Sequence, residues 1–157
     1  MDPGRREALR AGGGVSLLAL LAAAGWFATD EARAAEPGRA AFAAKSLADA
    51  VRALGGAPPS ASRDITFFAT PDIAENGANV PIGVTSALPK TESIAIVIEK
   101  NPNVLAAVFE IPPGTEPSLS IRVKMGQSSN VHALVRAAGR YHVATKEVRV
   151  TQGGCIG

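Results

Sequence analysis

The sequence VHALVRAAGRYHVATKEVRV, residues 131–150, contains two runs rich in β-forming residues on either side of Ala138-Gly139. The runs Val131–Ala137 and Tyr141–Val150 have the length and composition of strands. The dipeptide between them is a good turn former. The stretch therefore predicts a β-hairpin whose second strand runs directly into the last residues of the chain and gives them a rigid root.

Five more β-rich runs precede this hairpin, and turn-forming sequences separate them. About seven short strands with frequent turns predict a mainly β protein, an immunoglobulin-like β-sandwich over residues 57–150. The Cys and Trp hallmarks of antibody domains are absent, since the only tryptophan, Trp26, lies near the N-terminus. The five runs are Ile65–Phe68, Val80–Thr85, Ile94–Glu99, Leu105–Ile111 and Leu119–Met125, and the turns are Glu75–Gly77, Asn101–Asn103 and Pro112–Gly114.

An N-terminal α-helix is predicted within residues 35–56, ahead of the strands. Between Glu36 and Leu54, apolar side chains recur at helical spacing among alanines and charged residues. Gly55-Gly56 and Pro58-Pro59 are expected to end this helix. Its apolar stripe must pack either on the body of the domain or on a partner subunit, and it consists of Phe42, Leu47, Val51 and Leu54.

Residues 1–34 have the features of an export signal. Arg5-Arg6 is followed by the apolar run Val15–Ala24 and by Ala32-Arg33-Ala34, a small-x-small cleavage site. A twin-arginine pair before a mildly hydrophobic run resembles signals of the Tat route. A retained membrane anchor is the alternative, but the run falls well short of the roughly twenty residues that a spanning helix needs. We therefore expect cleavage, a periplasmic mature protein beginning near Ala35, and no membrane association.

The C-terminal segment 151–157 holds the only cysteine of the chain, Cys155. Gly153 and Gly154 precede it, and Ile156 and Gly157 follow. Glycines free the backbone, so we expect a flexible Gly-Gly-Cys arm whose five residues from Thr151 to Cys155 reach roughly 17 Å when extended, at about 3.3–3.6 Å per residue. Such an arm can enter a partner's cleft, but it cannot hold its thiol still for catalysis.

The composition excludes several classes of function. A net charge of +2 comes from scattered basic residues, and only 4% of residues are aromatic, so no nucleic acid partner is expected. His132 and His142 lie in adjacent predicted strands and could approach each other, but a metal site would lack a third ligand. We interpret both as solvated strand histidines. No metal or cofactor is expected.

Five separated segments together resemble the SoxY family of sulfur carriers in bacterial thiosulfate oxidation. The likeness covers, in order, essentially the whole chain after residue 34, and it extends to the Tat-type signal. The chain departs from the family at Ile156, where the family tail usually has glycine. The segments are Glu75–Gly77, Pro112–Pro117, Met125–Val131, Ala144–Val150 and Gly153–Gly157.

The resemblance implies a periplasmic carrier that is not an enzyme. Cys155 would accept thiosulfate through a SoxAX-type haem enzyme and hold it as a cysteine S-thiosulfonate. A SoxB-type hydrolase would release the terminal sulfonate as sulfate, and a SoxCD-type sulfur dehydrogenase would oxidise the remaining sulfane sulfur. The carrier would stay bound to a SoxZ-like subunit as a SoxYZ heterodimer. The fold that the resemblance implies, an immunoglobulin-like sandwich with an N-terminal helix, agrees with the pattern of runs and turns.

Two other functions fit the same tail. A periplasmic β-sandwich binding or structural module would use Cys155 only for an intermolecular disulfide. A thiol enzyme would turn over substrate as an isolated protein. Sulfur-oxyanion adducts on the tail peptide would distinguish a carrier from a disulfide-linked module.

Overall fold

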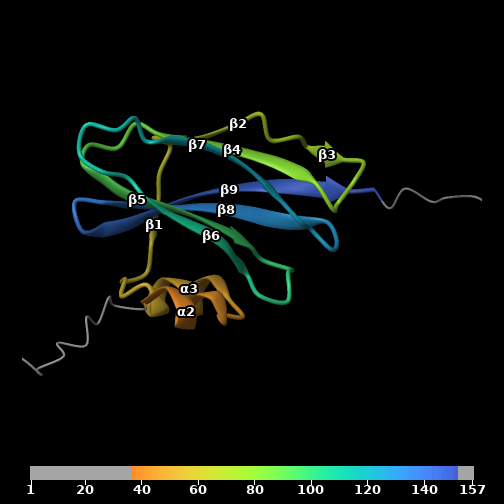
Figure 1. The fold of residues 1–157 in the computed structure, drawn as a ribbon, viewed down its shortest axis with the longest axis horizontal. Coiled ribbons are helices and arrows are strands. Elements are labelled where there is room, and N and C mark those ends of the chain that lie inside the picture. The colour runs from red at the N-terminus through yellow and green to blue at the C-terminus, as the bar shows by residue number, and fades with distance from the viewer. Residues whose placement is uncertain (1–36, 152–157) are drawn as a thin grey trace, which may run out of the picture. The chain divides into compact units, whose positions relative to one another are not determined.

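The structure, a computed structural model, describes residues 37–151, and in this range two sheets and a pair of short helices form three layers (Figure 1). The larger sheet lies in the middle, with the smaller sheet on one face and the helices on the other. The prediction of a mainly β protein with two packed sheets is confirmed. The elements are α2 (Pro37–Phe42), α3 (Leu47–Ala53), β1 (Ser60–Ala61), β2 (Ile65–Phe68), β3 (Ile73–Ala74), β4 (Val80–Ser86), β5 (Thr91–Ile98), β6 (Leu105–Glu110), β7 (Ser118–Val123), β8 (Ser129–Ala137) and β9 (Arg140–Val150).

The larger sheet has the order β1-β9-β8-β5-β6, and β3 also pairs with β9. The predicted hairpin is present, with β8 and β9 antiparallel and Ala137 opposite Arg140. Ala138 and Gly139 form its two-residue turn, and both have positive φ, 47° and 74°. This is the turn geometry whose twist matches that of the flanking strands. The smaller sheet has the order β2-β4-β7 and is antiparallel throughout.

The main core fills the space between the sheets. Successive residues of a strand point to opposite faces, so alternate side chains of β5 and β8 face the smaller sheet. Their partners come mostly from β4, together with Val123 at the end of β7 and Met125 just beyond it. This cluster of buried residues consists of Ile65, Ala74, Val80, Ile82, Val84, Ile94, Ile96, Ile98, Val123, Met125, Val131, Ala133, Val135 and Val148.

A second core lies on the other face of the larger sheet, beneath the helices. The predicted apolar stripe therefore packs on its own domain, although alanines supply most of the buried helical positions and Phe42 remains exposed. Tyr141 connects β9 of the larger sheet to the end of α3, because its hydroxyl donates to the carbonyl of Leu54 at 3.2 Å. The cluster consists of Ala41, Ala44, Ala50, Val51, Ala95, Val97, Val104, Leu105, Leu134 and Tyr141.

The prediction of one continuous helix from Glu36 to Leu54 is wrong. The chain forms α2 and α3 with a break between them, because Ser46 starts a new helix by accepting from the amide of Asp49 at 3.1 Å. Ala44 lies in the break, and its carbonyl accepts from Val104 instead of continuing the helix. The predicted stop is present, since Gly55 follows α3 with φ of 76°.

Candidate functional site

The end of β9 extends beyond the strand with which it forms the hairpin. The last pair between β8 and β9 at this end joins Ser129 and Val148, two residues before Val150. The amide of Val150 instead donates to the Ser128 hydroxyl at 2.9 Å. A side chain thus replaces a strand partner, so this end of β9 stays hydrogen-bonded.

The short strand β3 holds the other side of this end. It runs parallel to β9, with Ile73 opposite Arg149 and Ala74 opposite Val150. The amide of Thr151, the last described residue, donates to the carbonyl of Ala74 at 3.0 Å. Figure 1 shows β3 beside the end of β9. Val150 and Thr151, at the end of the described chain, are therefore both hydrogen-bonded, Val150 to Ser128 and Thr151 to Ala74.

A tight loop around Gly77 packs against Met125 and against Val150 at the end of β9. The amide of Met125 donates to the carbonyl of Gly77 at 2.7 Å. A Cβ atom at Gly77 would lie 2.4 Å from the carbonyl oxygen of Met125 and 2.8 Å from a methyl carbon of Val150. Because both distances are far below van der Waals contact, only glycine fits there. Asn76 shapes the loop, since its side-chain oxygen accepts from the amide of Ala78 at 2.9 Å.

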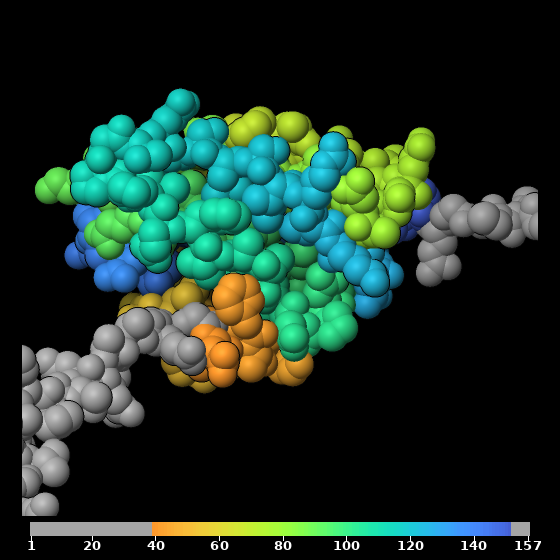
Figure 2. All heavy atoms as spheres, viewed as in Figure 1, coloured from red at the N-terminus to blue at the C-terminus, as the bar shows by residue number. Residues whose placement is uncertain are grey.

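Two hollows adjoin the end of β9. The first has a volume of about 530 Å³, and its lining consists of Glu75, Asn76, Gly77, Ala78, Lys124, Met125, Gly126, Val150 and Thr151. The second has a volume of about 360 Å³ and is lined by Asp72, Ile73, Lys146, Glu147 and Arg149. Figure 2 shows the yellow-green atoms of the segment around β3 beside the blue atoms at the end of β9.

The side chain of Lys146 crosses from β9 to the segment between β2 and β3. Its ammonium lies 3.1 Å from a carboxylate oxygen of Asp72 and donates to the carbonyl of Thr70 at 2.6 Å. The guanidinium of Arg149 lies 4.0 Å from a carboxylate oxygen of Glu147, and both side chains are exposed. Both cations are therefore partnered by carboxylates, so the second hollow is a mixed-charge surface.

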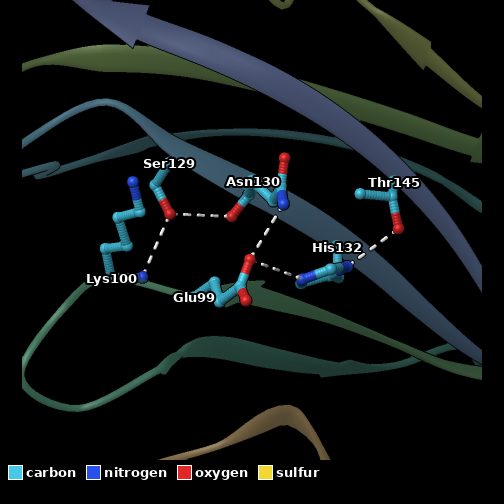
Figure 3. A network of polar contacts seen from close by, with 6 residues as sticks. All are labelled: Glu99, Lys100, Ser129, Asn130, His132 and Thr145. Carbon is cyan, nitrogen blue, oxygen red and sulfur yellow. Dashed lines mark hydrogen bonds and ion pairs between the residues drawn. The ribbon is translucent and has the colours of Figure 1, made fainter.

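His132 belongs to a polar network on the helix-covered face of the larger sheet (Figure 3). Its Nδ1 lies 2.8 Å from the Thr145 hydroxyl and its Nε2 lies 3.8 Å from a carboxylate oxygen of Glu99. Asn130 donates to the same oxygen at 2.9 Å. Burial lowers the pKa of His132, and the nearby Glu99 carboxylate only partly offsets this effect. With 12% of its side chain exposed, His132 is not the solvated residue that we expected.

The two histidines do not approach each other. His132 is opposite Thr145 and His142 is opposite Val135, so they occupy opposite faces of the sheet. His142 instead contacts the Ser60 hydroxyl at 3.1 Å. Between residues 37 and 151, no cluster of three or more potential metal ligands occurs. No helix in the same range is long and apolar enough to cross a membrane.

The predicted site residues Cys155, Gly153, Gly154, Ile156 and Gly157 lie outside the described residues. The fold nevertheless brings together the three segments that resemble the SoxY family and lie at this end: Glu75–Gly77, Met125–Val131 and Ala144–Val150. The fourth, Pro112–Pro117, lies elsewhere, in the connection between β6 and β7. The sequence did not reveal that Ser128 and β3 form hydrogen bonds with the end of β9.

Comparisons with known proteins point to one family. The family model described as "Sulfur oxidation protein SoxY" matches residues 51–155. Among solved structures, the sulfur carrier protein SoxY from Chlorobium limicola f thiosulfatophilum is 36% identical, with a TM-score of 0.62, covering 68% of this chain and 96% of that chain. A superoxide reductase (neelaredoxin) from Ignicoccus hospitalis is 17% identical, with a TM-score of 0.50 over 57% of this chain and 81% of that chain, which is a likeness of fold alone. No curated protein matches the sequence.

Proposed function

The chain belongs to the SoxY family of sulfur oxidation proteins, and we propose that it carries thiosulfate-derived intermediates covalently on Cys155. The observation that carries the proposal is the family match, which extends through the tail and ends at the cysteine itself. The hydrogen bonds that fix Val150 and Thr151 support the proposal. A covalent cargo on a short arm is delivered reproducibly only if the arm starts from a fixed position. The chain itself needs no enzymatic activity or cofactor for this role.

The chemistry requires an external oxidant. Joining the Cys155 thiol to the outer sulfur of thiosulfate forms an S–S bond and releases one proton and two electrons. A SoxAX-type haem enzyme would accept these electrons. Water would then cleave the terminal S–S bond of the S-thiosulfonate in a SoxB-type hydrolase, giving sulfate and a persulfide on Cys155. A SoxCD-type sulfur dehydrogenase would oxidise the outer sulfur of that persulfide.

The strand order supports an immunoglobulin-like assignment. Counting the seven predicted strands, the first, second and fifth form the smaller sheet, and the third, fourth, sixth and seventh form the larger one. This division differs from that of constant antibody domains only in the sheet that the fourth strand joins. The carrier would stay bound to a SoxZ-like subunit in a heterodimer. Residues 1–34 would direct export to the periplasm by the Tat route.

Mass spectrometry of the tail peptide tests the proposal. The purified protein is incubated with thiosulfate and a SoxAX-type haem enzyme, in parallel with Cys155→Ser. A thiosulfonate adduct on the wild-type peptide and none on the variant is expected. If the wild-type tail forms only disulfides between chains under these conditions, the alternative of a disulfide-linked periplasmic module replaces the carrier.

A further inference from the structure

The arm has a fixed origin and a short reach. Thr151 is bonded to Ala74 and Val150 is bonded to Ser128, so β9 is held up to the last described residue. Cys155 lies four residues beyond Thr151 in the sequence. Because an extended chain spans at most about 3.3–3.6 Å per residue, the two Cα atoms lie within about 14 Å of each other.

This limit determines where an enzyme that acts on Cys155 can bind. A cleft that surrounds the modified cysteine takes up much of the tether length. The rim of the cleft must therefore contact residues that surround Thr151, whatever the enzyme's overall shape. Two hollows adjoin the end of β9 here, one lined by Thr151 itself and the other by Arg149.

Ile73 is the exposed large apolar side chain of this surface. Four large hydrophobic residues are exposed in the described part of the chain, and Ile73 is the most exposed of them, at 56%. It pairs with Arg149, one residue before the end of β9. Its hollow is otherwise lined by charged residues that partner one another, Asp72 with Lys146 and Glu147 with Arg149. An apolar centre inside a polar rim is the usual composition of a protein interface.

We infer that the docking face, formed by Ile73 and the two hollows beside the end of β9, binds the cleft rim of the enzyme that loads Cys155. The inference rests on the proposed function, and it assigns to the folded domain a part in recognition that the arm alone does not have. The occupant is a protein surface with an apolar group placed against Ile73. Its polar groups lie against the surrounding charges.

The test uses Ile73→Glu in the full chain, with Phe109→Glu as the matched control. Phe109 is also an exposed large hydrophobic residue on a strand, at 36%, but it lies on β6 at the opposite edge of the larger sheet. Loading by the haem enzyme and thiosulfate is followed by mass spectrometry of the tail peptide. Labelling of Cys155 by a small maleimide reports whether the thiol remains accessible. Ile73→Ala is measured as well, because it removes the apolar contact without adding a charge to β3.

We expect Ile73→Glu to lower kcat/KM for loading about tenfold, with kcat at saturating carrier and the rate of maleimide labelling unchanged. Ile73→Ala should show a smaller loss in the same direction, and Phe109→Glu none. Loading of Ile73→Glu at the wild-type rate, or an equal loss in Phe109→Glu, would overturn the docking face while leaving the carrier function intact. A wild-type dimer in gel filtration that Ile73→Glu dissociates would assign the face to a second copy of the chain. Absence of loading in the wild type would overturn the carrier function and the docking face together.

Discussion

The amide nitrogen of Thr151 lies 3.0 Å from the carbonyl oxygen of Ala74, across 77 positions of sequence. This hydrogen bond joins the end of the longest strand to β3, a strand of only two residues. The position of the arm's origin is therefore a tertiary property, and substitutions far from Cys155 in the sequence should change it.

Gly77→Ala should loosen the root of the arm. The added methyl group would collide with the carbonyl of Met125 and with Val150, so we expect a loss of about 1–3 kcal/mol in the free energy of unfolding, measured by urea denaturation. Hydrogen exchange at Val150 and Thr151 should quicken as well. Gly126→Ala is the control, because a Cβ there meets no atom within 4 Å. Equal losses in the two variants would contradict this account of the root.

Ala138→Asn should stabilise the hairpin. Ala138 has φ of 47°, a left-handed conformation that costs an ordinary residue roughly 1–2 kcal/mol and that asparagine tolerates better. We expect a gain of about 0.5–1 kcal/mol in the free energy of unfolding, seen as a higher Tm. Gly139→Ala should lower the free energy of unfolding, because Gly139 has φ of 74°, a conformation that alanine adopts only with strain. No atom lies within 4 Å of a new Cβ there, so backbone strain is the sole expected cause. A destabilised Ala138→Asn would show that the turn tolerates only a small side chain.

The hairpin and the other long strands could be predicted because each combines β-forming composition with a turn at its end. Strand β3 could not, since two residues such as Ile73-Ala74 have no periodicity to read. Their role depends on β9, which extends two residues beyond its pairing with β8 and pairs there with β3. The interruption of the helix did have a local signal, because Ser46 and Asp49 have the spacing of an N-terminal cap.

The candidate site could be predicted only in part. The glycines and cysteine of the arm are visible in the sequence, whereas its root depends on Ser128 and Ala74, which meet β9 only in the folded protein. The environment of His132 likewise depends on strand register. A shift of one residue would have placed it on the other face of the sheet, away from Glu99.

The stability of the protein should fall as the pH drops below neutrality, partly through His132. Its folded pKa lies below the ordinary value of 6.5, chiefly because of burial. The unfolded chain therefore takes up the proton first, so the contribution of His132 to stability is complete above 6.5 and is lost as the pH falls toward the folded pKa. Urea denaturation at about pH 8 and about pH 5.5 should show a smaller difference in His132→Gln than in the wild type.

Glu99→Gln provides the matched variant for this effect. Glu99 raises the pKa of His132 by its charge and by hydrogen bonding, so its removal should lower that pKa further and enlarge the loss of stability at acid pH. A pH dependence that is the same in His132→Gln and in the wild type would assign the loss to other groups.

Replacing Gly153 and Gly154 by proline should slow loading of Cys155 by the haem enzyme without changing the intrinsic reactivity of its thiol. Proline at positions 153 and 154 fixes φ near −65° at two consecutive residues, so the chain can no longer bend to follow a narrow cleft. Maleimide labelling of Cys155 needs only exposure and should remain at the wild-type rate, whereas loading by the haem enzyme should fall about tenfold or more.

Ile156→Gly gives the complementary variant, because it removes a β-branched side chain beside the cysteine and increases the freedom of the arm. Loading should be unchanged or faster in this variant, with labelling again at the wild-type rate. The two rates are to be measured in parallel on the same preparations. If labelling and loading fall together in the proline variant, or if neither falls, the flexibility of residues 153 and 154 is not what delivers Cys155 to the enzyme.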